Sequence, residues 1–172
     1  MVGGAETITH TESLTRRVVG ISQMAVSTDP GELLVTYSLG SCVGVTIYDP
    51  RARVGGLVHC LLPLSRQEPE KAKKNPAMFT DSGVVALIQG VLDAGASREN
   101  LHVKVAGGAS PLDTCGRFKI GERNVTVLRK VLWKNDLMLA AEDVGGTQPR
   151  TLSLYMDRGR CTVRTAGQEV DL

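Results

Sequence analysis

The amino-acid sequence predicts a single α/β domain, a strand-rich α/β sandwich with two main helices. Apolar, β-rich runs gather toward both ends of the chain, and two segments between them have apolar residues at helical spacing. This grouping argues against a strict series of β-α-β units, and we find no internal repeat or linker. The 172 residues are enough to bury one substantial core. We expect the polar residues 1–16 to form a flexible lead-in and residues 17–172 to form the domain.

Four strands are predicted in the first part of the domain. They cover residues 18–27, 33–37, 43–48 and 57–62. The turn sequence TDPG at residues 28–31 separates the first two, and Asp49-Pro50 follows the third. Pro63 ends the fourth strand because its ring removes a backbone donor from the ladder.

The remaining elements alternate between helix and strand. A charged loop is predicted over residues 65–79, and loops of this length are often functional. The first helix is expected to begin at Thr80 or Asp81 and to end near Ala94, before Gly95. The second helix is predicted over residues 121–134. Further strands are predicted over residues 101–106 and 137–142, and a terminal hairpin over residues 152–156 and 160–164.

Composition excludes several functional classes. The net charge of +2 and the aromatic content of 3% do not favour a nucleic-acid partner. No apolar run is long enough to cross a bilayer, so we expect no membrane insertion. We expect no secretory leader and a cytoplasmic location, where thiols stay reduced. The four cysteines are scattered without a CxxC motif, which argues against a zinc ribbon and against a thioredoxin-type redox motif.

Two residues with reactive side chains lie on consecutive predicted strands. In an antiparallel hairpin, opposed residue numbers have a constant sum, and a loop centred on residues 50–51 would place Cys42 opposite His59. A longer turn would make them diagonal neighbours on the same face. A nucleophilic thiol needs access and a neighbouring base, and His59 could supply the base. A cysteine at a strand is more often a packing residue, so these residues alone leave both interpretations open.

Because side chains alternate along a strand, the residues beside Cys42 and His59 can each be assigned to one face of the sheet. Cys60 is expected on the opposite, apolar face, with residues such as Val43 and Val45. Gly44 shares the face of Cys42, and we expect it to leave room for a substrate. Gly40 and Ser41 are predicted to form a turn that exposes Cys42.

The surroundings of the pair contain a specific combination of motifs. They are LVTYSLGSCVGV (residues 34–45), YDP (48–50), GGLVHCLLP (55–63), GGA (107–109), IGERN (120–124) and DVGG (143–146) with Arg150. In this order the chain resembles the CheD family of chemoreceptor glutamine deamidases. The resemblance covers roughly residues 18–165. Ser38 departs from it, since glycine is expected there in many members.

The resemblance implies a fold, a reaction and a site. The fold would be an α/β sandwich similar to toxin deamidases of the cytotoxic necrotizing factor type. The reaction would convert glutamine side chains of chemotaxis receptors (methyl-accepting chemotaxis proteins) to glutamate through a thioester. It assigns Cys42 as nucleophile, His59 as base and Thr36 as the residue that orients His59. A glutaminase of this kind needs no metal or cofactor, and methylesterase activity on receptor glutamate esters is an expected side activity.

The expected partners follow from the same resemblance, and the expected oxyanion donors follow from the predicted Gly40-Ser41 turn. The substrate would be the cytoplasmic region of the chemoreceptors, and a CheC-type phosphatase would be a further partner of a chain that is monomeric alone. Candidate oxyanion donors or substrate contacts are the backbone amides in the turn before the strand at residues 43–48 and at the start of that strand. These residues are Gly40, Ser41, Val43 and Gly44. The loop at residues 65–79 and the segment 107–117 are expected to contact the substrate.

Three other functions stay open. The chain could be a binding module that stimulates a CheC-type phosphatase acting on the response regulator. It could be another thiol hydrolase, either a peptidase or an amidase for small molecules. It could also be a redox-sensing thiol protein, although Cys60, the cysteine nearest to Cys42 in sequence, is expected on the wrong face to resolve it.

Overall fold

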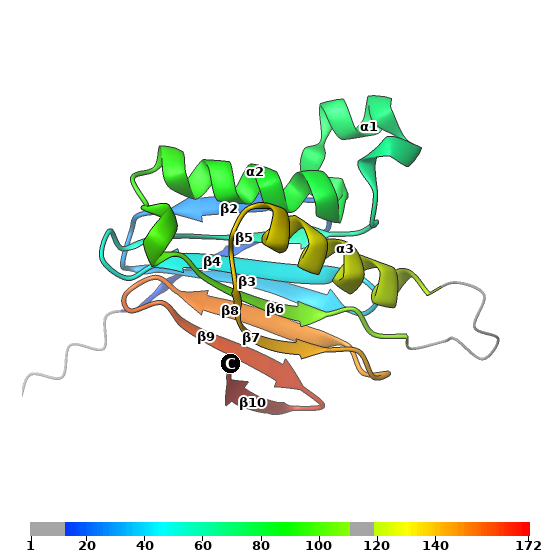
Figure 1. Ribbon diagram of the computed structural model, residues 1–172. Helices are drawn as coiled ribbons and strands as arrows, with labels where there is room; N and C mark the ends of the chain where they lie inside the picture. Colours follow the sequence, from blue (N-terminus) through cyan, green and yellow to red (C-terminus); the bar gives the residue numbers. More distant parts are fainter. Residues whose placement is uncertain (1–12, 111–118) are drawn as a thin grey trace, which may run out of the picture.

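The computed structural model describes residues 13–110 and 119–172, which form two five-stranded sheets and a helical layer (Figure 1). The first sheet contains, in spatial order, β1 (Thr15–Val18), β3 (Glu32–Leu39), β8 (Arg150–Tyr155), β9 (Arg160–Thr165) and β10 (Gln168–Asp171). The second contains β2 (Met24–Ser27), β5 (Val54–Cys60), β4 (Val43–Asp49), β6 (His102–Gly107) and β7 (Leu139–Val144). The predicted mixed α/β class is therefore confirmed.

The main helices cover the outer face of the second sheet (Figure 1). They are α2 (Thr80–Asp93) and α3 (Ile120–Lys134). Their apolar stripes pack on the helix-facing side chains of the central strands; from the helices these include Val84, Leu87, Val91, Leu128 and Leu132, and from the strands Val43, Val45, Ile47 and Val58. Strands β4 and β5 are buried along their whole length, because helices cover one of their faces and the first sheet covers the other.

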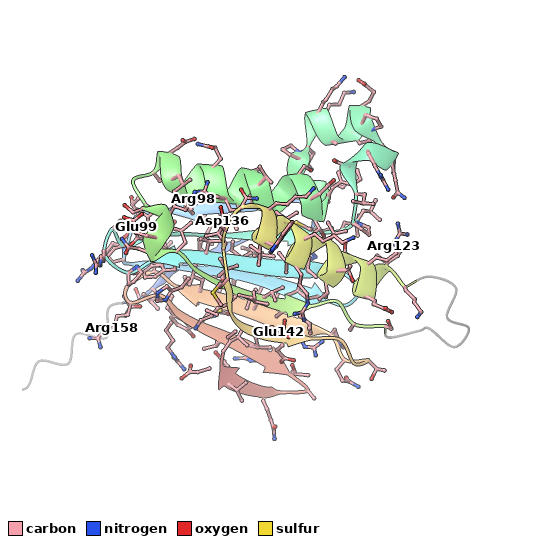
Figure 2. All side chains as sticks on the ribbon, viewed as in Figure 1. Arg98, Glu99, Arg123, Asp136, Glu142 and Arg158 are labelled. Atoms are coloured by element: carbon pink, nitrogen blue, oxygen red, sulfur yellow. The ribbon has the colours of Figure 1, made fainter. Side chains whose placement is uncertain are left out.

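A second core lies between the two sheets. It contains Leu34, Leu39, Leu57, Leu152 and Leu154, with Cys42 at one end. The outer face of the first sheet has no covering layer among the described residues, and all four residues of its edge strand β1 are exposed. Figure 2 shows charged side chains such as Arg98, Arg123 and Arg158 projecting from the outside of the molecule.

Several sequence predictions differ from the structure in extent. The single strand predicted over residues 18–27 is two strands in different sheets, β1 and β2, because the chain turns at Ser22, which has a left-handed φ of 60°. Strand β1 begins at Thr15, inside the predicted lead-in, whereas residues 1–12 lie outside the described residues. Strand β7 ends two residues later than predicted, and the terminal strand β10 was not predicted.

The predicted loop over residues 65–79 contains short helices. They are the 3₁₀ turns at Ser65–Gln67 and Pro76–Met78 and the helix α1 (Pro69–Lys74). A third 3₁₀ turn, Arg98–Asn100, precedes β6. Pro69 and Pro76 each stand at the start of such a turn, where a missing backbone donor costs nothing. None of the described helices is long and apolar enough to cross a membrane.

Candidate active site at the crossing between the two sheets

The nucleophile candidate lies where the chain crosses from one sheet to the other. The β3–β8 ladder has a bulge between Thr36 and Leu39, and Ser38 there has a left-handed φ of 58°. The Gly40 amide donates to the Ser38 carbonyl at 2.9 Å, which closes a tight turn. Cys42 follows directly and precedes β4, with 7% of its surface exposed. A turn therefore precedes Cys42, but it is closed between Ser38 and Gly40 rather than formed by Gly40 and Ser41, and the prediction that it exposes Cys42 is wrong, because the side chain packs between the sheets.

The strand β6 supports this crossing segment from the side. The amides of Gly108 and Ala109 donate to the carbonyls of Cys42 and Gly40, each at 2.8 Å. Gly107 has a φ of 112°, and a Cβ atom there would lie 2.2 Å from the Cys42 carbonyl oxygen. Only glycine allows this approach, so the GGA motif at residues 107–109 has a direct role in holding the backbone of Cys42.

His59 and Thr36 meet across the two sheets. The Thr36 Oγ1 and His59 Nδ1 atoms lie 2.7 Å apart, and both residues are buried. Thr36 belongs to β3 in the first sheet and His59 to β5 in the second. The other ring nitrogen, Nε2, is buried and has no hydrogen-bond partner in the described part of the chain. One nitrogen is therefore oriented by Thr36, and the other is free to exchange a proton.

The register of the β4–β5 hairpin differs from the predicted one by two residues. His59 lies opposite Gly44 rather than opposite Cys42, because the turn between Asp49 and Val54 is four residues long. A change of two residues keeps every side chain on its predicted face. Cys42 and His59 are therefore diagonal neighbours on the face toward the first sheet, the alternative expected for a longer turn. The structure has no hydrogen bond between their side chains.

Burial favours the neutral form of both residues. It raises the pKa of the Cys42 thiol, although the residue's own backbone N–H partly opposes this rise. It lowers the pKa of His59 to about 4. The free protein therefore holds a neutral thiol and a neutral imidazole near pH 7.

The structure contradicts the expectation that Gly44 leaves room for a substrate. A Cβ atom at this position would lie 2.8 Å from Leu39 Cδ1 and 3.0 Å from Leu152 Cδ2. The space beside Gly44 is filled by these two side chains of the first sheet. Gly44 therefore serves close packing of the sheets, since a larger residue there would push them apart.

The other two described cysteines, Cys60 and Cys161, are both buried. Cys60 is fully buried on the helix side, where its sulfur is close to Gly83 of α2. This confirms its predicted face, and burial raises its thiol pKa further. Cys161 is buried between the sheets, 3.6 Å from Thr46 Oγ1. Cys115 lies outside the described residues.

The predicted oxyanion donors lie around the crossing turn. In the described part of the chain, the amides of Ser41 and Cys42 donate to no backbone carbonyl. Gly40 uses its amide within the turn, and Val43 is the first residue of β4, paired with both β5 and β6. The amides of Ser41 and Cys42 are thus the two that the local backbone leaves available.

The sequence analysis missed one residue beside the site. Asn124 of α3 is completely buried, and its side chain contacts the backbone of the crossing segment. Its sequence signal was a polar side chain on the apolar stripe of a predicted helix, three residues after Gly121 and four before Leu128.

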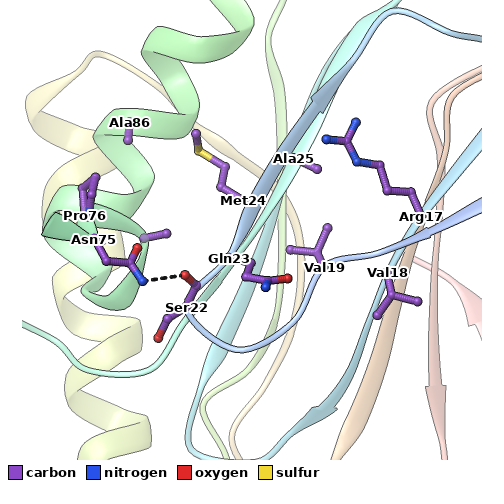
Figure 3. Close-up of a pocket in the computed structure, with 11 residues that line it drawn as sticks. Arg17, Val18, Val19, Ser22, Gln23, Met24, Ala25, Asn75, Pro76 and Ala86 are labelled. Carbon is purple, nitrogen blue, oxygen red and sulfur yellow. Dashed lines mark hydrogen bonds between the residues drawn. The ribbon is translucent and has the colours of Figure 1, made fainter.

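One sizeable pocket lies elsewhere. It has a volume of about 410 Å³ and lies between β2 and the start of α2, with Arg17, Met24 and Asn75 among its lining residues (Figure 3). Asn75 Nδ2 donates there to the Ser22 carbonyl at 2.9 Å. Neither Cys42 nor His59 lines this pocket, so it is separate from the candidate site.

Comparisons with known proteins identify the family of this chain. A family model described as CheD chemotactic sensory transduction matches residues 61–165. A protein of Syntrophus aciditrophicus named probable chemoreceptor glutamine deamidase CheD 1 is 44% identical over 150 residues, which cover 87% of this chain and 94% of that protein. A protein of Solibacter usitatus with the name probable chemoreceptor glutamine deamidase CheD is 43% identical, covering 90% and 92%.

A solved structure gives a weaker likeness. The hypothetical protein YfiH of Bacillus licheniformis aligns with a TM-score of 0.42 at 11% identity, covering 70% of this chain and 49% of that one. The family rests on the sequence relatives, which are above 40% identical and match nearly their whole length. The chain therefore belongs to the CheD family.

Proposed function

We propose that this protein hydrolyses specific glutamine side chains of chemoreceptors to glutamate and releases ammonia. The names of its relatives support this activity, since they are called probable chemoreceptor glutamine deamidases. The observation that supports it most directly is the 2.7 Å contact between Thr36 Oγ1 and His59 Nδ1. It orients a buried imidazole on the same face as the Cys42 thiol, as a Cys–His hydrolase requires.

The first half of the reaction forms a thioester. His59 Nε2 takes the thiol proton while Cys42 Sγ attacks the carboxamide carbon of the glutamine. The tetrahedral intermediate has an oxyanion, which the amides of Ser41 and Cys42 would stabilise. The C–N bond then breaks, and the imidazolium gives its proton to the leaving ammonia.

The second half regenerates the enzyme. His59 Nε2 takes a proton from water, and the hydroxide attacks the thioester carbon. The C–S bond breaks, the thiolate recovers the proton from His59, and the product is the glutamate side chain. The mechanism needs Nε2 as the base, so the Nδ1–H of the imidazole would donate to Thr36 Oγ1, and a hydroxyl 2.7 Å away can accept this hydrogen bond.

The substrate would be the cytoplasmic region of chemoreceptors, and the enzyme would be a cytoplasmic monomer that needs no cofactor. Methylesterase activity on receptor glutamate esters and binding to a CheC-type phosphatase are further expectations, as is kinship of the fold with toxin deamidases. Residues 107–110 lie beside the crossing segment, because the Gly108 and Ala109 amides donate to the Cys42 and Gly40 carbonyls, and they would contact the receptor. Residues 65–79 are a second expected contact, and residues 111–117 lie outside the described residues.

Mass analysis of a receptor fragment tests the proposal. After incubation with the protein, each modified glutamine should show the mass change of an NH₂ group replaced by OH, with one ammonia released. Cys42→Ala should abolish both signals. Cys60→Ala is the matched control, because Cys60 faces the helices and should not affect the reaction. Full activity of Cys42→Ala would refute the assignment of the nucleophile.

Two further measurements separate the alternatives. Ammonia release from free glutamine would favour a small-molecule amidase over a receptor deamidase. Stimulation of a CheC-type phosphatase by Cys42→Ala, without deamidation, would reveal a binding role that is independent of the thiol.

A further inference from the structure

Asn124 is a buried amide that uses its polar atoms at the candidate site. Its Nδ2 group donates to the Ser41 carbonyl at 2.9 Å and to the Leu61 carbonyl at 3.2 Å. Its Oδ1 atom accepts from Thr80 Oγ1 at 2.9 Å. The side chain is completely buried, so these three bonds replace the solvation it lost on folding. Asn124 therefore ties α2 and α3 to two backbone positions beside the catalytic candidates.

These two backbone positions lie where the β4–β5 ladder stops. The last pair in the ladder is Val43 with Cys60, and continuation in register would place Cys42 opposite Leu61. The chain turns toward the other sheet there instead. The Asn124 amide bridges the Ser41 and Leu61 carbonyls across this gap. It thereby fixes the crossing segment relative to the strand of His59.

The bond to Ser41 also sets the direction of the next amide. A trans peptide is planar, so the Ser41 carbonyl and the Cys42 N–H point in opposite directions. Asn124 belongs to α3, which packs on the helix-covered face of the second sheet, and it holds the Ser41 carbonyl toward that layer. The Cys42 N–H must then point away from the helices, toward the space between the sheets. The Cys42 side chain packs in that space.

One further observation agrees with this orientation. The Cys42 N–H donates to no carbonyl in the described residues, so it is available to another acceptor. An oxyanion formed by attack of the thiol would be such an acceptor.

We propose that Asn124 is a positioning residue that holds the Cys42 N–H toward the reacting carbonyl as an oxyanion donor. The inference rests on the proposed deamidase function. Thr80 has a part in the same positioning role, because its hydroxyl donates to Asn124 Oδ1 and so orients the amide with its N–H groups toward the two carbonyls. Asn124 touches neither the substrate nor the thiol and acts only through the Ser41–Cys42 peptide.

Two reactions of the same thiol distinguish positioning from general support. Deamidation of a receptor fragment forms an oxyanion, whereas alkylation of Cys42 by iodoacetamide occurs at a saturated carbon and forms none. Both need the same thiol and access. In Asn124→Asp and Asn124→Ala, kcat should fall about 10-fold to 100-fold, with KM nearly unchanged. This fall is at most near the lower end of the roughly 100-fold to 1000-fold fall in kcat that follows removal of a whole oxyanion donor. The alkylation rate of the fully ionised Cys42 thiolate, taken from the high-pH plateau and followed on the Cys42 peptide, should stay within about twofold, because this limiting rate does not depend on the thiol pKa.

Matched variants control for folding. Val91→Ala removes core volume in α2 far from the crossing, so it should lower the melting temperature and leave kcat unchanged. Thr80→Val keeps the shape of residue 80 but removes the hydroxyl, and it should lower kcat a few-fold with unchanged alkylation. If both Asn124 variants fail to fold, Thr80→Val alone tests the positioning role, and an unchanged kcat in this variant would overturn it.

The outcomes separate the inference from the function on which it rests. Deamidation by the parent protein together with unchanged kcat in the folded Asn124 variants would overturn the positioning role. An equal fall in kcat and alkylation rate would also overturn it, because that result means general loss of the site. Absence of deamidation by the parent protein would refute the proposed function, and the inference with it.

Discussion

The buried imidazole of His59 makes a definite prediction about stability in acid. Its pKa is lowered by burial from 6.5 to about 4, and only 1% of the residue surface is exposed. At 1.36 kcal/mol per pH unit, this gap corresponds to about 3 kcal/mol. Protonation would place a charge in the core between the sheets, beside a single hydroxyl partner.

The sign follows from the protons that each state binds. The unfolded chain takes up a proton on His59 near pH 6.5, whereas the folded chain does so only near pH 4. The free energy of unfolding is therefore unaffected by this residue above about pH 6.5. It should fall as the pH drops from there toward 4, and by about pH 5 the loss should be about 2 kcal/mol.

Urea unfolding from about pH 8 to about pH 5 measures this loss. His59→Gln cannot titrate in this range but can still hydrogen bond to Thr36, so its stability should lose about 2 kcal/mol less than the parent's over the same interval. Asp49 and Glu169, whose lowered pKa values also weaken the fold in acid, act equally in both proteins. His102→Gln, at an exposed position, should follow the parent protein. Parallel curves for the parent and His59→Gln would refute the buried neutral imidazole.

Other substitutions test neighbouring features. Thr36→Val should cost about 1–3 kcal/mol and lower kcat, because it leaves His59 Nδ1 unpaired in the core, and Thr36→Ser should recover much of both. Ser38→Gly should raise the free energy of unfolding by up to about 1 kcal/mol, because Ser38 has a left-handed φ of 58°. Gly44→Ala should cost about 1–3 kcal/mol, because its Cβ would lie 2.8 Å from Leu39 Cδ1. The acid limb of kcat/KM should lie near pH 4 rather than near 6.5, because the free enzyme's base is the neutral His59.

Urea unfolding and steady-state deamidation, each at fixed pH, check these four predictions. Equal kcat for Thr36→Val and Thr36→Ser would contradict an orienting hydrogen bond. An unchanged or higher free energy of unfolding for Gly44→Ala would show that the two sheets are not closely packed at this position. An acid limb near the ordinary histidine pKa would mean that His59 is solvated before the reaction begins.

Much of the local structure could be predicted from periodicity. The helices at Thr80–Asp93 and Ile120–Lys134 agree closely with their predicted ranges, since their apolar stripes recur every three or four residues. The predicted face of each side chain in β4 and β5 was also correct although the turn is longer than two residues, because the register differs by two residues and not by one. Cys42 and His59 accordingly share a face, with Cys60 on the other.

Long-range packing decided what periodicity could not show. Residues 18–27 read as one strand, but β1 and β2 join different sheets, because that choice depends on partners elsewhere in the chain. Gly44 was interpreted as open space from its own size, yet Leu39 and Leu152 fill that space from the opposite sheet. No spacing rule relates these residues, so only the packed structure brings them together.

The sequence by itself determined the α/β class, the two main helices, the shared face of Cys42 and His59, and, through its motifs, the CheD family. These features depend on side chains close in sequence, or on a recognised order of motifs. Only the tertiary structure decided that Thr36 reaches His59 across two sheets and that Asn124 ties the Ser41 carbonyl to the helices. Those contacts join residues 23 and 83 positions apart, and they form because both sides of the second sheet are covered when the layers pack.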